Sequence, residues 1–201
     1  MIRDGVVYRA ASLDDISGLV ALDQRKWEEN VSAGYDKWES RMRIFPEGVR
    51  VAADEGGVVG VAVVHIVRYP ESGFPTWSEI TADGYITNHN PLGNKIYGVN
   101  FAVDSVRPKV AYNLLESVVD EVARPRDLPW RVGYTAPFVS KYKERFGVDE
   151  LNEEIVERLA LEDPIVNRLF FRLGFKFLGV SRDYFVDDRL SDGWGVMLEI
   201  E

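Results

Sequence analysis

The sequence has no cysteine among its 201 residues. This excludes disulfide bonds, thiol nucleophiles, thiolate zinc sites and iron–sulfur clusters. Only two histidines occur, His65 and His89, so we expect no histidine-rich metal site and no metal cofactor. A chain of this length buries enough apolar surface to fold without either kind of cross-link.

Long apolar runs are also missing. The longest, residues 58–67, is about half of what a membrane span needs and contains His65. The N-terminal residues carry no apolar segment of the kind that marks a secretory signal. There is no Gly-x-Ser-x-Gly elbow, phosphate-binding P-loop or dinucleotide fingerprint. We therefore expect a cytoplasmic protein without a membrane partner.

Acidic residues outnumber basic ones, 33 to 24, which gives a formal net charge of −9. Such a protein repels phosphate backbones at long range, so we expect no nucleic-acid partner. The same field favours a cationic or amine substrate.

The hydrophobic pattern predicts strands and helices in alternation along one domain, residues 1–201. It predicts an α/β mixed sheet of about seven strands with helices on both faces. Residues 69–94 contain three prolines and three glycines and are expected to form an irregular insertion. A long insertion of this kind is usually functional. The predicted strands are 6–10, 49–53, 58–67, 96–103, 130–136, 175–185 and 194–200, and the predicted helices are 12–27, 35–45, 108–124, 148–161 and 163–174.

Two local patterns point to a known family. Residues 96–115 predict a strand, a tight turn and an amphipathic helix, and Leu169-Phe170-Phe171-Arg172-Leu173-Gly174-Phe175 resembles the helix ending "LY-x-x-LGF". With the element order, these patterns resemble the GNAT superfamily of acyl-CoA N-acyltransferases. The 69–94 insertion and residues 163–191 look more narrowly like the GNAT domain that some bacteria fuse to a nitrilase-like amidohydrolase; here we expect that domain to stand alone.

The resemblance implies transfer of an acyl group from acetyl-CoA, or another acyl-CoA, to a small-molecule or peptide amine. The amine would attack the thioester directly in a ternary complex.

The family's phosphate-binding motif, Gln/Arg-x-x-Gly-x-Gly/Ala, aligns with residues 106–111. Ala111 fits the motif, whereas Val106 replaces Gln or Arg and Lys109 replaces glycine. Backbone N–H groups at this helix start, with the cations Arg107 and Lys109, would hold the pyrophosphate. The expected cofactor-binding residues are Phe101, Ala102, Val103, Arg107, Pro108, Lys109, Val110, Ala111 and Phe170.

The resemblance also implies a bulge near residues 100–103 that turns a backbone N–H toward the thioester carbonyl. The splay of residues 131–136 would receive the pantetheine arm. An alkyl amine is protonated at neutral pH and needs a base, for which Glu79, His89, Asp104 and Tyr134 are candidates. Phe170 stands where many members have a tyrosine acid, so the acid is Tyr134, Tyr142 or Tyr184, or none is needed. Tyr134, Tyr184 and His89 are the catalytic residues we predict.

A second interpretation stays open. The altered 106–111 motif and Phe170 also suit a GNAT-like domain that has lost turnover and works as a CoA-binding or regulatory module. The C-terminal strand hairpin would permit a homodimer under either interpretation.

Overall fold

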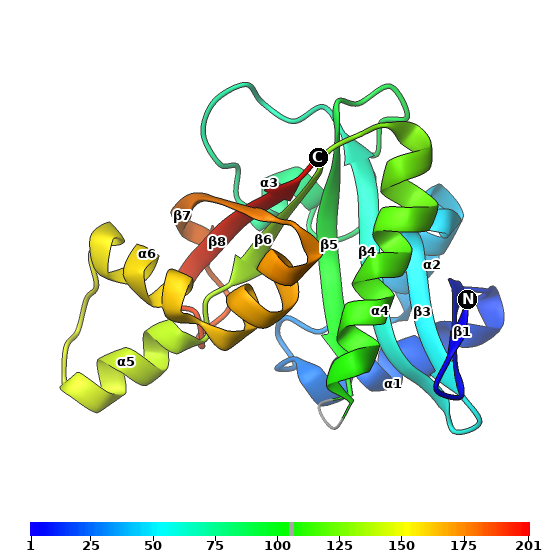
Figure 1. Cartoon of the computed structure of the whole chain (residues 1–201), viewed down its shortest axis with the longest axis horizontal. Coiled ribbons are helices and arrows are strands. Elements are labelled where there is room, and N and C mark those ends of the chain that lie inside the picture. The colour runs from blue at the N-terminus through cyan, green and yellow to red at the C-terminus, as the bar shows by residue number, and fades with distance from the viewer. Residues whose placement is uncertain (105–106) are drawn as a thin grey trace.

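One sheet of eight strands organises the structure, a computed structural model that describes residues 1–104 and 107–201, with Pro108 described by its backbone alone. The strand order is β1-β2-β3-β4-β5-β6-β8-β7 (Figure 1). Neighbours are antiparallel except β5 and β6, which are parallel. The strands are β1 Ile2–Arg3, β2 Val6–Ala10, β3 Val49–Asp54, β4 Gly57–Val67, β5 Lys95–Val103, β6 Trp130–Thr135, β7 Lys176–Phe185 and β8 Gly193–Ile200.

Helices cover both faces, as the sequence predicts. On one face α1 (Ile16–Lys26), α2 (Tyr35–Ile44) and α3 (Trp77–Thr81) lie behind the sheet in Figure 1. On the other face α4 (Pro108–Val118) crosses in front of β4, and its chain continues through η3 (Val119–Ala123) and η4 (Arg124–Arg126). The chain then adds α5 (Phe138–Phe146), α6 (Glu153–Glu162) and η5 (Val166–Phe171) beside β6 and β8.

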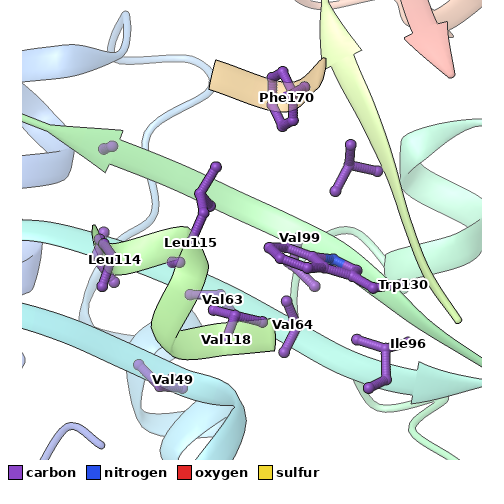
Figure 2. Close-up of a cluster of buried hydrophobic side chains, with 14 of the residues drawn as sticks. Val49, Val63, Val64, Ile96, Val99, Leu114, Leu115, Val118, Trp130 and Phe170 are labelled. Carbon is purple, nitrogen blue, oxygen red and sulfur yellow. The ribbon is translucent and has the colours of Figure 1, made fainter. Parts of the chain in front are cut away.

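The core forms where the apolar stripe of α4 meets the sheet. Leu114, Leu115 and Val118 recur at helical spacing and are buried, and Figure 2 shows them beside Val63 and Val64 of β4. On the opposite face Trp38 of α2 is fully buried. Burial of such side chains is the main favourable term that holds both helix layers against the sheet.

Local signals in the sequence set several helix ends. The Ser12 backbone N–H donates to the Asp15 carboxylate at 2.7 Å, which closes a capping box at the start of the first helical segment. Asp163 accepts hydrogen bonds from the backbone N–H groups of Ile165 and Val166 at 2.8 and 3.1 Å. Gly174, at φ +99°, ends that segment in a conformation that glycine adopts without strain.

The structure differs from the expected elements in five places. Strand β1 adds an eighth strand at one edge. Helix α5 was not predicted, and α6 begins at Glu153 behind an Asn152 cap rather than at residue 148. The segment 163–174 has a wide π turn at its centre rather than a regular α-helix. The irregular insertion contains the short helix α3. Within the described ranges, every helix falls short of the length and apolar character of a membrane span.

Candidate active site between the splayed strands

The parallel strands β5 and β6 separate after a short paired stretch. Ile96 lies opposite Trp130 and Tyr97 opposite Arg131, and beyond these two pairs β6 continues its ladder with β8 alone. The two strands therefore diverge from Gly98 onward. This is the splay that the resemblance to the GNAT superfamily implies for residues 131–136.

A bulge in β5 lies at the point of divergence. Val63 of β4 faces Asn100 and Val64 faces Gly98, so Val99 stands opposite no residue of β4. The expected position, residues 100–103, was one residue too late. The Val99 carbonyl accepts a hydrogen bond from the Trp77 indole N–H at 2.9 Å, which fixes the bulge against α3.

A cavity of about 140 Å³ opens between the splayed strands. Its walls come from both faces of the sheet: Leu115 of α4 and Phe170 of η5 line it on one side, and Arg41 of α2 on the other. Leu115, Phe170, Val99 and Trp130 are labelled in Figure 2. The lining residues are Trp27, Val31, Arg41, Ala62, Val63, Trp77, Gly98, Val99, Asn100, Phe101, Leu115, Trp130, Val132, Gly133, Tyr134, Thr135, Phe170, Tyr184 and Phe185.

Five of the ten buried polar atoms without a hydrogen-bond partner in the described part of the protein belong to residues that line this cavity. They are Trp27 Nε1, Arg41 Nη1, Asn100 Oδ1, Trp130 Nε1 and Tyr134 Oη. Each such atom costs about 1–3 kcal/mol when it is left unpaired in the interior. Their concentration around one cavity indicates a site whose hydrogen bonds are completed by a ligand.

The three predicted catalytic residues occupy three different settings. Tyr134 lines the cavity, its ring centroid 5.8 Å from that of Phe170, and burial raises the pKa of its hydroxyl well above the ordinary value. Tyr134 therefore holds its proton at neutral pH. The Tyr184 ring also lines the cavity, but its hydroxyl accepts from Tyr97 at 2.9 Å and donates to the Gly133 carbonyl at 3.2 Å.

His89 lies elsewhere. It stacks on Phe45 at 4.5 Å, and its Nδ1 accepts the Ile66 backbone N–H at 3.2 Å. Together with Arg126 it lines a second, separate hollow. The structure thus does not bring His89 together with Tyr134.

The other base candidates are occupied by local interactions. The Glu79 carboxylate accepts from the backbone N–H and the hydroxyl of Thr76 at 2.9 Å in the capping box of α3. The Asp104 carboxylate lies 3.6 Å from the Lys26 ammonium. Among the base candidates, Tyr134 is the one that the described cavity lining contains.

The predicted cofactor-binding residues divide between two surfaces. Phe101 and Phe170 line the cavity, whereas Ala102 and Val103 follow on β5 outside its lining. Ala111 is buried on α4, and the Pro108 backbone begins that helix. Val106 lies outside the described residues.

Arg107 and Lys109 point away from the splay. Together with Val110 they line a hollow beside the β1–β2 and β3–β4 turns. Arg107 forms an ion pair with Asp54, and Lys109 lies 3.4 Å from Asp4. Both pairs are at the surface, where such interactions contribute little and are readily exchanged for another anion.

Four of these five polar side chains were not predicted from the sequence as parts of the site: Trp27, Arg41, Asn100 and Trp130. Arg41 carried a readable signal. Trp38, Arg41, Met42 and Phe45 follow the i, i+3, i+4, i+7 spacing of one helix face, so the pattern places an arginine on the buried stripe of α2.

Comparison with known proteins agrees with this geometry. No protein-family model matches the sequence. The chain is 29% identical over 204 residues to the Bacillus subtilis protein named "Probable hydrolase YhcX", of which the match spans 38%, and 96% of the chain is covered. It is 26% identical over 210 residues to "Uncharacterized N-acetyltransferase YkwB" from the same organism, covering 98% of the chain and 92% of that protein.

Among solved structures, the GphF GNAT-like decarboxylase in complex with isobutyryl-CoA superimposes with a TM-score of 0.76 at 21% identity. The superposition covers 96% of this chain and 97% of that one. The mixed sheet with helices on both faces is thus the fold of this GNAT-like structure, as the sequence predicts.

Proposed function

We propose that the chain is an acyl-CoA-dependent N-acyltransferase and that the group it transfers is acetyl. The observation that carries the proposal is the cavity at the splay, where the Val99 bulge and the unpartnered Tyr134 hydroxyl line one space. The name of YkwB, an N-acetyltransferase, and the acyl-CoA bound in the GphF structure support it.

The cavity fits an acyl-pantetheine arm. It is mostly apolar, and α4 lies on the same face of the sheet as η5, which carries Phe170 (Figure 1). The first turn of α4 would therefore be available to the phosphates. The Val99 backbone, displaced from the β4 ladder, would polarise the thioester carbonyl.

In the transfer step, one tyrosine is enough to balance the protons lost and gained. The acceptor first gives its ammonium proton to solvent water. The neutral amine nitrogen then attacks the carbonyl carbon, a C–N bond forms, and the C–S bond breaks. The nitrogen loses one proton and the departing thiolate gains one. Tyr134, protonated at neutral pH, would donate to the sulfur and recover its proton from the nitrogen.

Release of free thiol from acetyl-CoA in the presence of a panel of amines tests this proposal. We expect thiol release that depends on the acceptor and saturates with both substrates. CoA binding by calorimetry without thiol release from any amine would instead favour the binding or regulatory module. Failure to bind CoA at about millimolar concentration would contradict both.

A further inference from the structure

Arg41 is held in place as a buried guanidinium. Its side chain is 1% exposed, its Nε donates to the Gly84 carbonyl at 2.7 Å, and its guanidinium carbon lies 4.6 Å from the Trp38 ring centroid. These contacts fix the orientation of the group, because one nitrogen is bound and one face is stacked. The remaining nitrogens are therefore presented in a defined direction.

The Arg41 side chain borders the cavity. Its Nη1 is buried without a partner, and the other described lining residues carry no formal charge. Within the described residues Arg41 forms no ion pair within 4.0 Å, although the buried Asp23 carboxylate and the Asp36 carboxylate act on the guanidinium at longer range and oppose the lowering of its pKa. Burial lowers the pKa of Arg41 to about 10, so the group is still cationic at neutral pH. A buried charge facing a cavity is costly unless an anion completes it.

Asn100 presents the complementary group. Its Nδ2 donates to the buried Asp23 carboxylate at 2.8 Å, and since a carboxylate only accepts, this contact fixes the orientation of the amide. The Asn100 Oδ1 is left buried without a partner in the cavity wall. A carbonyl oxygen in this position accepts an N–H from an amine.

The face of the sheet on which they lie assigns the Arg41 guanidinium and the Asn100 amide to the acceptor. Arg41 belongs to α2, which lies on the face of the sheet opposite to α4 (Figure 1). Tyr134 packs against Phe170 of η5, on the α4 face. Cofactor and acceptor would thus reach the bulge from opposite faces.

We infer that the ligand of this cavity carries a carboxylate, bound by Arg41 Nη1, and that the acceptor class is an amino acid or another aminocarboxylate whose amine meets Asn100 Oδ1. This inference rests on the proposed function for the role of the amine. The carboxylate itself could also belong to the acyl group of a dicarboxylic acyl-CoA, and the experiment separates these two sources.

The first experiment compares matched ligands on the unmodified chain. One arm offers acetyl-CoA with α-amino acids and with their carboxamides, which differ in the negative charge. The other arm offers one fixed amine with acetyl-CoA and with malonyl- or succinyl-CoA. We expect kcat/KM to favour the carboxylate-bearing ligand by about tenfold or more in one arm. Equal values for acid and neutral partner in both arms would overturn the inference.

The second experiment changes the guanidinium. Arg41→Gln should abolish the preference by raising KM for the carboxylate-bearing ligand, and Arg41→Lys should retain part of it. Arg50→Gln is the matched control, because Arg50 is 4% exposed, pairs with Glu121 at 2.5 Å and lies outside the cavity lining. If Arg41→Gln does not fold, Arg41→Lys and the ligand pairs still decide the question.

Calorimetric binding of the same ligand pairs separates this inference from the proposed function. Preferential binding of the acids without thiol release would support the carboxylate site and refute acyl transfer. Efficient transfer to neutral amines, with acids and amides bound equally, would support acyl transfer and refute the carboxylate site. A preference that survives in Arg41→Gln would assign the anion to another group and overturn the role of Arg41.

Discussion

At the scale of single residues, two tyrosines share one cavity wall but differ in what their hydroxyls do. The Tyr184 hydroxyl is bonded to Tyr97 and to the Gly133 carbonyl, whereas the Tyr134 hydroxyl has no partner in the described part of the protein. A bonded hydroxyl stabilises the fold, and an unbonded one facing the cavity is free to serve the reaction. The two positions should therefore respond differently to the same change.

Tyr134→Phe should lower kcat for thiol release by about a hundredfold or more, the usual size of a general-acid contribution. It should leave the free energy of unfolding unchanged or raise it, because an unpaired buried hydroxyl is removed. Tyr184→Phe should instead lower the free energy of unfolding by about 1–2 kcal/mol, because two buried hydrogen bonds are lost. Denaturant titration and steady-state kinetics of both variants measure the two effects. Tyr69→Phe, at a buried tyrosine outside the cavity lining, controls for loss of any tyrosine. Equal kcat in Tyr134→Phe and the unmodified chain would remove Tyr134 from the mechanism.

At the scale of elements, the sequence and the structure give different partners to the cations at the start of α4. Arg107 and Lys109 suggest phosphate contacts in the sequence, but they pair with Asp54 and Asp4 in the structure. The two observations agree if the surface pairs exchange when a phosphate arrives. Such an exchange costs little, since exposed ion pairs contribute about 0–1 kcal/mol.

Asp54→Asn should then tighten CoA binding slightly by releasing Arg107, and Arg107→Gln should weaken it by about twofold to tenfold, less so at high salt. Calorimetric titration of CoA at two salt concentrations measures both effects. Unchanged affinity in both variants would show that Arg107 belongs to the surface pair alone and that backbone N–H groups of α4 carry the phosphate contact.

The strands were predictable because their signals are local. Alternating and continuous β-branched runs mark β3, β4 and β5 in the sequence, and their observed bounds agree to within about a residue or two. Helix α5 was missed because it is short, nine residues, and follows the turn at Ala136-Pro137. The exact bulge position depends on the register between β4 and β5, which no single strand encodes.

The candidate site was harder to predict for the same reason. Its polar atoms come from Trp27, which follows α1, and from α2, β5 and β6, segments that the chain brings together only through the sheet order. The sequence indicated Tyr134, Phe101 and Phe170 through their places in a known pattern. It could not indicate that the Asn100 side chain takes part in the site, because the contact that orients this side chain, with Asp23, joins residues far apart in the chain.

At the scale of the whole molecule, acid should destabilise the protein through a buried histidine. His65 is fully buried on β4, and burial lowers its pKa from 6.5 to about 3. Below pH 6.5 the unfolded chain binds a proton that the folded chain excludes. Stability is therefore complete above pH 6.5 and falls as the pH decreases toward 3.

For this one group the loss between pH 6 and pH 5 is about 1 kcal/mol, a range in which most carboxylates have not yet titrated. The variant His65→Leu should lose less stability over the same interval, whatever its stability at pH 7. Urea unfolding at the two pH values gives the comparison. A decrease from pH 6 to pH 5 as large in His65→Leu as in the unmodified chain would place the acid sensitivity elsewhere.

The central claim is that the splay between β5 and β6 receives the acyl-pantetheine arm. Its most direct test is calorimetric titration of acetyl-CoA into the unmodified chain and into Thr135→Trp, which fills the cavity from β6. We predict a saturable one-site isotherm for the unmodified chain and binding weaker by about tenfold or more for the variant, at an unchanged melting temperature. Equal affinity in the two proteins, or no saturable binding to the unmodified chain, would contradict the account.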